Sequence, residues 1–207
     1  MQDDVRTQLE ADVRARCERG DHAGAATAIL RGYGPELLGF LAAIHRDEAA
    51  ASETFAELAE TLWRALPRFA WESTARTWAY AVARNVVRSR KRGAARRQRR
   101  VVQPGEEFFE EMAQKVRTET LAYLRTEKKT RLQALRDALV EEDRMLLILR
   151  VDRGLPWNEL ARILTETESE EPLDDVAIAR EAARLRKRFQ LVKDRLRDLA
   201  RKEGLLE

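Results

Sequence analysis

Residues 174–200 read DDVAIAREAARLRKRFQLVKDRLRDLA, and this stretch has the clearest helical period in the chain. Its apolar side chains recur every three or four residues, which places them on one face of a helix. They are Ile178, Ala182, Leu185, Phe189, Val192, Leu196 and Leu199. Arg180, Arg184 and Lys187 keep the same rhythm about 200° away around the helix axis. We therefore predict a long helix that packs through one face and presents a basic face on the other side.

The composition of the whole chain excludes several classes of protein. Of its 207 residues, 36% are charged and 44% are hydrophobic, which is too charged for a membrane protein and too apolar for a disordered one. The 9 glycines and 5 prolines are few, as is typical of a mostly helical chain. The first residues, with Asp3 and Asp4, lack the basic-then-apolar pattern of a secretion leader, so we expect no export. We expect an all-α protein of the cytoplasm, with no membrane partner.

The residue types that carry catalysis do not occur at suitable spacings. His22 and His45 have neither a carboxylate pair nor a cysteine at metal-ligand distance along the chain. No glycine-rich loop of the phosphate-binding kinds is present. Cys17 is the single cysteine, so an intramolecular disulfide is excluded, and its polar surroundings indicate an incidental thiol. We therefore expect no enzymatic activity, no cofactor and no metal.

The net charge of +3 hides a segregation of charge along the chain. Between Ser73 and Gly105 there is no acidic residue, whereas ten are arginine or lysine. Because like charges repel, a block this dense favours an anionic partner, although a solvated arginine tail remains an alternative.

Aromatic residues lie beside the start of this basic block, at Phe69, Trp71, Trp78 and Tyr80. Rings stack on unpaired bases while guanidinium groups bind phosphates, so the combination suits single-stranded nucleic acid. Core packing is the alternative for Trp78 and Tyr80, because Trp78 shares a helix face with Val82 and Val86. For Trp78 the two interpretations are equal.

Breaks in the helical pattern predict two small helical domains joined by a linker. We place the first domain at 1–100, the linker at 101–130 and the second domain at 131–207, because Gln103-Pro104-Gly105 is the clearest helix breaker. In the first domain, Pro35 is expected to start a new helix and Ser73 or Thr74 to cap another. In the second, residues 156–164 and the long helix after them read as a helix-turn-helix, the arrangement that places its second helix in the major groove of DNA.

Several strings carry a resemblance to a known family. They are YGPELL at 33–38, LWRALPRF at 62–69, ESTARTWAYAVARN at 72–85, EEDRMLLILR at 141–150, WNELARIL at 157–164 and LRKRFQ at 185–190. The first three resemble the second sigma domain of the extracytoplasmic-function (group 4) sigma factors of bacterial RNA polymerase, and the last three are similar to their fourth domain. From the length we expect none of the extra domains of primary sigma factors, which fits group 4.

The resemblance implies a function in transcription initiation. The first domain is expected to dock on the clamp helices of the polymerase β′ subunit and to capture the −10 promoter element as melted single strand. The second is expected to read the −35 element as duplex and to contact the β flap. Core polymerase and promoter DNA are thus the expected partners, with an anti-sigma factor a further candidate.

The resemblance also implies which side chains carry these functions. At the −10 element they are Phe69, Trp71, Glu72, Ser73, Thr74, Arg76, Trp78, Tyr80, Arg84, Asn85 and Arg88. At the −35 element they are Arg180, Arg184, Arg186, Lys187 and Arg188. For docking on the clamp they are Glu53, Glu57 and Trp63.

The chain departs from the family pattern in two places. Family members usually carry Asp-x-x-Gln-Glu where this chain has Glu53-Thr54-Phe55-Ala56-Glu57, so Ala56 replaces the amide. The turn of the helix-turn-helix is extended and acidic, from about Thr165 to Ala179. Either the extra segment is a loop before a longer reading helix, or it changes the angle of that helix.

Two other functions fit the same pattern. One is a stand-alone helix-turn-helix regulator that binds duplex DNA without polymerase. The other is a helical protein-interaction adaptor, for which the basic block is incidental.

Overall fold

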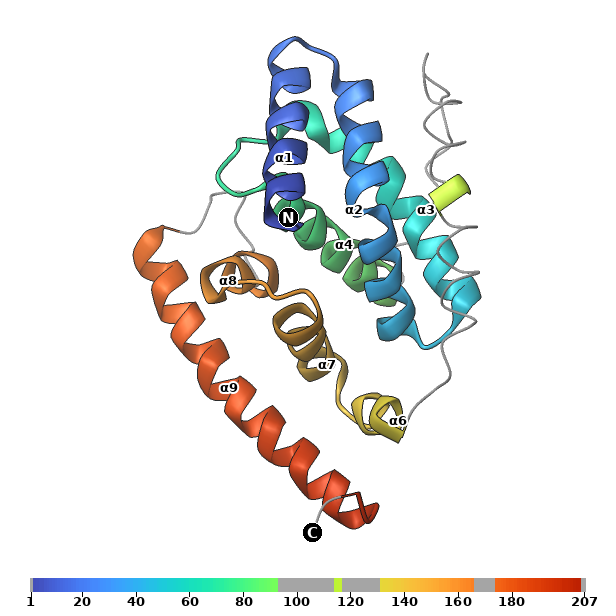
Figure 1. Ribbon diagram of the computed structural model, residues 1–207, viewed down its shortest axis with the longest axis vertical. Helices are drawn as coiled ribbons and strands as arrows, with labels where there is room; N and C mark the ends of the chain where they lie inside the picture. Colours follow the sequence, from blue (N-terminus) through green and yellow to red (C-terminus); the bar gives the residue numbers. More distant parts are fainter. Residues whose placement is uncertain (1, 93–113, 117–130, 166–173, 206–207) are drawn as a thin grey trace. The chain divides into compact units, whose positions relative to one another are not determined.

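A computed structural model describes residues 2–92, 114–116, 131–165 and 174–205 (Figure 1). Within these ranges all regular structure is helical, which confirms the predicted all-α class. The chain divides into two compact units, Met1–Thr126 and Glu127–Glu207. Apart from the short helical piece at 114–116, the linker expected at 101–130 lies outside the described residues. None of the described helices is long and apolar enough to cross a membrane.

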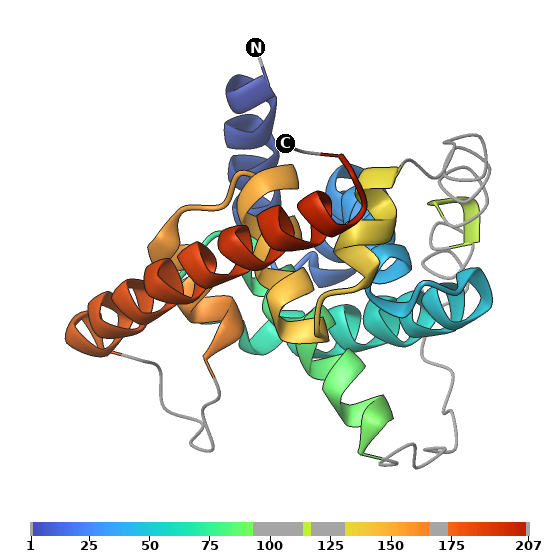
Figure 2. The same ribbon diagram turned by 90° about the horizontal axis from the view of Figure 1, so that it is seen from below.

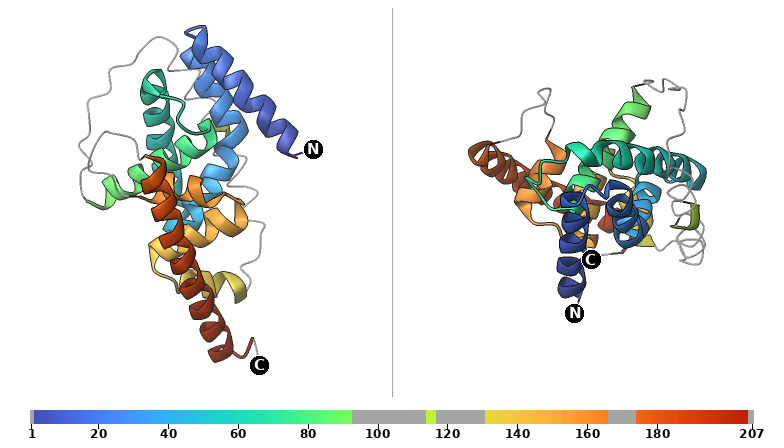
Figure 3. Two further views of the ribbon diagram at one scale, coloured as in Figure 1. Left: turned by 90° about the vertical axis from the view of Figure 1, so that its left-hand side faces the viewer. Right: turned by 90° about the horizontal axis from the view of Figure 1, so that it is seen from above.

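The first unit is built around one central helix. It contains α1 (Gln2–Glu18), α2 (His22–His45), α3 (Glu48–Ala65), a 3-10 turn (Leu66–Arg68) and α4 (Ala75–Lys91). Of these helices, α2 packs against α1, α3 and α4, and Figures 1 and 3 show α1 beside it. Half of the residues of α2 are buried, so it supplies the core around which the other helices are placed.

Helix α2 is continuous across Gly34-Pro35, and the expectation that Pro35 begins a new helix was wrong. Proline removes one backbone hydrogen bond and strains the preceding turn. Burial of Leu30 before this point and of Leu37 and Leu38 after it outweighs that loss, because all three side chains are fully buried in the unit. Gly34 faces Val116, and a Cβ at Gly34 would lie 2.8 Å from that side chain, closer than real contacts allow.

Side chains just before α2, α3 and α4 determine where these helices begin. Asp21 accepts a hydrogen bond from the backbone N–H of Gly24 at 2.8 Å, and Asp47 accepts one from Ala50 at 2.6 Å. Thr74 accepts from the N–H of Thr77 at 3.1 Å, so the predicted cap of α4 is confirmed. Such caps contribute about 1 kcal/mol each.

A buried ion pair joins α4 to α2. The Nε and Nη2 atoms of Arg76 donate to the two carboxylate oxygens of Glu36 at 2.7 and 3.0 Å. Only 10% of the Arg76 side chain and 18% of the Glu36 side chain are exposed. Forked pairing of this kind fixes both side chains, and each charge depends on the other because water is excluded.

The second unit packs three short helices against one long helix. It contains α6 (Arg131–Asp137), α7 (Glu141–Leu147), a π-helical turn (Ile148–Asp152), α8 (Trp157–Leu164) and α9 (Asp175–Lys202). Figure 2 shows α9 running across the others, and α9 contacts α6, α7 and α8.

The packed face of α9 is the one that its sequence predicts. Ile178, Ala182, Leu185 and Val192 are buried, and Phe189 and Leu196 are partly buried against the core of this unit. Asp174 caps the helix by accepting from the N–H of Ala177 at 2.6 Å. The predicted long amphipathic helix is therefore confirmed.

We predict that the Arg76–Glu36 pair is needed for the stability of the first unit. Glu36→Ala should lower the free energy of unfolding by about 3–5 kcal/mol, because Arg76 would stay buried without this carboxylate. Urea unfolding followed by circular dichroism measures the change. The matched control is Glu60→Ala, which removes a carboxylate from a pair with Arg64 whose side chains are 37% and 39% exposed. Its expected effect is below about 1 kcal/mol, and equal losses for the two variants would contradict the prediction.

Candidate nucleic-acid interface

Three aromatic rings gather where the loop before α4 meets that helix. The centroid of the Phe69 ring lies 4.7 Å from that of Trp71 and 4.8 Å from that of Trp78, and the Phe69 and Trp78 rings are close to parallel at 23°. Each of the three side chains is half-buried. We call Phe69, Trp71 and Trp78 the ring cluster. Partly exposed, mutually packed rings are suited to stacking on unpaired bases.

Trp71 has an unusual backbone conformation. Its φ angle is +60°, in the left-handed region that bulky side chains rarely adopt. Such a conformation costs about 1–3 kcal/mol and persists only where the surroundings hold it. Here the ring of Phe69 packs against the ring of Trp71, and the guanidinium of Arg14 lies 5.5 Å from the Trp71 ring centroid. The loop is therefore held in one strained conformation next to the half-buried rings.

A carboxylate from α1 fixes the start of α4. The two oxygens of Glu10 accept hydrogen bonds from the backbone N–H groups of Ala75 at 2.8 Å and Arg76 at 3.0 Å. The Tyr33 hydroxyl on α2 donates to the same carboxylate at 2.7 Å. A negative charge at a helix N-terminus is favourable because it faces the positive end of the helix dipole. Burial and the bond to Glu10 raise the pKa of the Tyr33 hydroxyl above its usual range. Glu10 thus joins α1, α2 and α4 directly behind the loop.

Sequence reasoning did not identify Glu10 or Arg14. Neither belongs to a motif, and Glu10 bonds to residues 65 and 66 positions further along the chain. The residues near Glu10 in the sequence do not indicate a contact with residues so far along the chain. What the sequence does contain is their spacing of four residues, which puts both on one face of a helix.

The residues expected at the −10 element fall into two groups. Glu72, Thr74 and Asn85 are exposed, and Ser73 and Arg88 are half-exposed, so these five and the ring cluster lie at the surface of the unit.

The remaining three residues lie inside the unit, and their assignment as DNA contacts is corrected. Tyr80 is fully buried, with its ring edge-on to that of Phe40 at 5.5 Å. Arg76 and Arg84 are only 8% and 7% exposed, and Arg76 is bound to Glu36. The sequence identifies these side chains as basic or aromatic but does not report their burial. Their contribution is to the packing that supports the loop.

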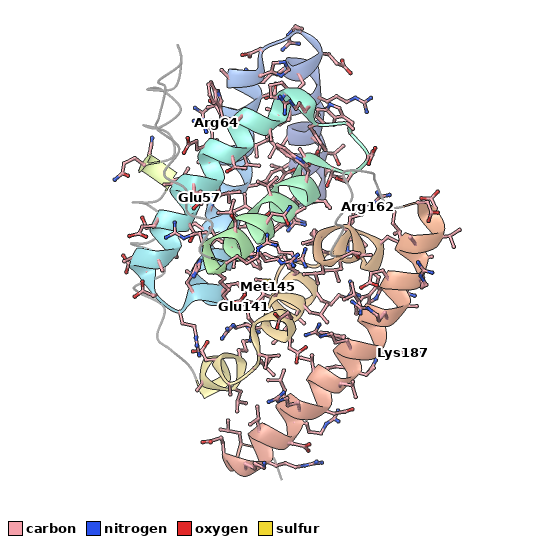
Figure 4. All side chains as sticks on the ribbon, turned by 180° about the vertical axis from the view of Figure 1, so that it is seen from behind. Glu57, Arg64, Glu141, Met145, Arg162 and Lys187 are labelled. Carbon is pink, nitrogen blue, oxygen red and sulfur yellow. The ribbon has the colours of Figure 1, made fainter. Side chains whose placement is uncertain are left out.

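The residues expected to dock on polymerase lie on α3. Arg90 of α4 contacts Glu53 at 2.7 Å and Glu57 at 3.1 Å, while Trp63 is half-buried. Figure 4 shows Glu57 and Arg64 on the same helix. The Glu53 side chain is 69% exposed, so it remains accessible while it is paired.

The basic face of α9 is exposed along the first half of the helix. Arg180, Arg184, Arg186 and Lys187 are all exposed, and Lys187 points away from the helix in Figure 4. Arg184 pairs with Glu181 at 2.8 Å, and Arg186 lies 5.8 Å from the ring centroid of Trp157. Within the described ranges, Arg180 and Lys187 form no ion pair.

Unlike the other basic residues predicted at the −35 element, Arg188 forms an ion pair with a residue of another helix within the described ranges. Its Nε donates to Asp143 of α7 at 2.7 Å, and its side chain is 39% exposed. It therefore ties α9 to α7 in this structure.

Helix α9 begins at the start of the helix predicted over residues 174–200, so the turn before it ends ahead of the expected Ala179. Helix α8 ends at Leu164 and α9 starts at Asp175, with a length of 28 residues. The start at Asp175 follows from the cap by Asp174. Most of the acidic insertion, residues 166–173, lies outside the described residues.

The described residues contain no cluster suited to holding a metal ion, because no three His, Cys, Asp or Glu side chains are grouped there in a suitable way. Burial raises the pKa of the Cys17 thiol, which lowers its reactivity at neutral pH because the thiolate is the nucleophile.

Comparison with known proteins places the ring cluster in a known domain. Residues 29–97 match the family model described as sigma-70 region 2. No curated protein matches the chain. The matched segment includes most of α2, all of α3 and α4 and the loop between them, whereas α1 and the second unit lie outside it. The match supports a factor of the sigma-70 family, with a role in transcription initiation through RNA polymerase and promoter DNA.

Alanine variants are usually more stable than glycine variants. We predict that the left-handed backbone at Trp71 reverses this order of stability. Trp71→Gly should be more stable than Trp71→Ala by about 1 kcal/mol, because glycine adopts positive φ without strain. Thermal unfolding of the two variants measures the difference. At the neighbouring Ala70, which is not at positive φ, Ala70→Gly should instead lower stability. A Trp71→Gly variant less stable than Trp71→Ala would contradict the strained conformation.

Proposed function

We propose that the chain is a group 4, extracytoplasmic-function sigma factor that acts in the cytoplasm with core RNA polymerase and has no catalytic activity of its own. The observation that carries this proposal is the ring cluster, which lies within the segment matched to sigma-70 region 2. A rigid aromatic surface beside exposed polar side chains is the arrangement that capture of a melted strand requires.

In this proposal the first unit binds the −10 element after strand separation. Flipping a base out of the stack costs a few kcal/mol, and a pocket with aromatic and polar walls returns that free energy. The groups that we assign to this contact are Phe69, Trp71, Glu72, Ser73, Thr74, Trp78, Asn85 and Arg88. Because the loop is already fixed, little ordering of the protein is needed when the strand binds.

The second unit is proposed to be the fourth sigma domain, with α8 and α9 as its helix-turn-helix. The exposed basic face of α9 supports contact with the duplex −35 element, since side chains on such a helix reach base edges in the major groove. We assign this contact to Arg180, Arg184, Arg186 and Lys187. Arg188 is left out because it is bound to Asp143.

Docking on polymerase is proposed to use α3 and the second unit. Glu53, Glu57 and Trp63 are assigned to the clamp helices of the β′ subunit, and the second unit to the β flap. We propose residues 101–130 as the linker between the two DNA-binding domains. An anti-sigma factor remains a candidate partner.

We predict that promoter opening and polymerase binding can be separated by mutation. In transcription with core polymerase on a genomic promoter library, the wild-type chain should give promoter-dependent transcripts. Trp71→Ala should reduce open complexes about 5- to 150-fold, the equivalent of about 1–3 kcal/mol for one stacked base, and Asn85→Ala should act in the same direction. Both variants should bind core polymerase normally in a pull-down.

The matched control for Asn85 is Gln8→Ala, which removes an exposed amide from α1 and should leave opening unchanged. The proposal would be overturned by the absence of any promoter-dependent transcript. Tight, sequence-specific binding of duplex DNA without polymerase would favour a stand-alone regulator instead.

We also predict that Lys187 contributes to recognition of the duplex element. Lys187→Ala should weaken closed complexes by about 1–3 kcal/mol if the ammonium contacts a base, with the loss confined to one promoter position. Electrophoretic mobility shifts on single-base promoter variants measure this. Lys202→Ala, which removes an exposed lysine from the other end of α9, is the control. Equal losses of affinity for every DNA sequence would indicate that Lys187 contacts a phosphate instead of a base.

A further inference from the structure

The N-terminal helix α1 reaches the ring cluster although it lies outside the segment matched to sigma-70 region 2. Arg14 places its guanidinium 5.5 Å from the centroid of the Trp71 ring. The Arg14 side chain is 62% exposed. A cation is therefore held over the Trp71 ring and is open to solvent.

The position of Arg14 is fixed by contacts one turn earlier on the same helix. Glu10 binds the first two N–H groups of α4 and the hydroxyl of Tyr33. Close packing of α1 on α2 adds to this, because a side chain at Gly32 would collide with Leu9. Residues four apart share one helix face, so the bonds of Glu10 hold Arg14 beside the loop.

Arg14 also forms an ion pair with Glu18, which a phosphate can replace. Its Nε contacts Glu18 at 3.2 Å, and the two side chains are 62% and 66% exposed. Exposed pairs of this kind contribute little to stability. A phosphate offers the same guanidinium two strong acceptor oxygens in forked geometry, so it can displace Glu18 without a large loss.

We propose that Arg14 binds a backbone phosphate of the single strand whose bases stack on the ring cluster, so that α1 forms one wall of the single-strand site. This inference rests on the proposed function of the ring cluster. A strand whose bases stack on the ring cluster carries its backbone past the cluster, where the guanidinium over the Trp71 ring can bind a phosphate. The contact is independent of sequence and adds affinity rather than specificity.

Salt dependence distinguishes this contact from a purely structural one. If Arg14 only supports Trp71, its removal weakens stacking but leaves the number of neutralised phosphates unchanged. If it binds a phosphate, its removal lowers the slope of log K against log salt concentration by about 0.7, the value for one phosphate on a single strand.

The test uses the full chain and a fluorescein-labelled, mixed-sequence single-stranded oligonucleotide of about twenty nucleotides, long enough to span a single-strand site. Fluorescence anisotropy over a series of salt concentrations gives the affinity and the slope. Arg14→Ala should weaken binding several-fold at low salt and reduce the slope, whereas Arg14→Lys should retain the slope. Arg19→Ala removes an exposed arginine just beyond the end of α1 and should change neither quantity.

Trp71→Ala provides the separate test of the ring cluster, and it should lower affinity without lowering the slope. An unchanged slope for Arg14→Ala, together with weaker binding by Trp71→Ala, would overturn the phosphate contact alone. Wild-type affinity in Trp71→Ala, or no binding by the wild-type chain, would overturn the single-strand site and this inference with it. Circular dichroism spectra of all variants confirm that each has folded.

Discussion

The contacts at the N-terminus of α4 determine where the ring cluster lies. Glu10 bonds the first two N–H groups of that helix from α1, Thr74 bonds a third from the loop, and Arg76 ties the same turn to Glu36 on α2. Three different segments therefore converge on a single helical turn. Because Trp71 precedes this turn by only a few residues, its strained backbone has a fixed support on one side.

Where a helix begins and which of its faces packs could be predicted from the sequence because both are local properties. Thr74 occupies a cap position that short side chains with an oxygen acceptor prefer, and the period of α9 defines its buried face. The break before Pro35 was predicted from equally local information and was wrong. The cost of Pro35 inside α2 is offset by contacts with other helices. No window of neighbouring residues contains those contacts.

The candidate site was predictable only in part for the same reason. The rings and the exposed loop residues follow from composition near α4, but the burial of Arg76, Tyr80 and Arg84 depends on partners such as Glu36, forty positions away. The sequence alone does not distinguish an arginine that binds DNA from an arginine in a buried ion pair. Glu10 and Arg14 were missed because their importance arises only when α1 is placed beside the loop.

The length of α9 has a mechanical consequence for the second unit. Its 28 residues form one uninterrupted helix of about 42 Å at 1.5 Å per residue, with the exposed basic side chains in its first half and contacts to α6 and α7. A continuous helix transmits rotation along its axis because every turn is bonded to the next. A change of tilt at the C-terminal end of α9 would therefore also move the basic side chains in its first half.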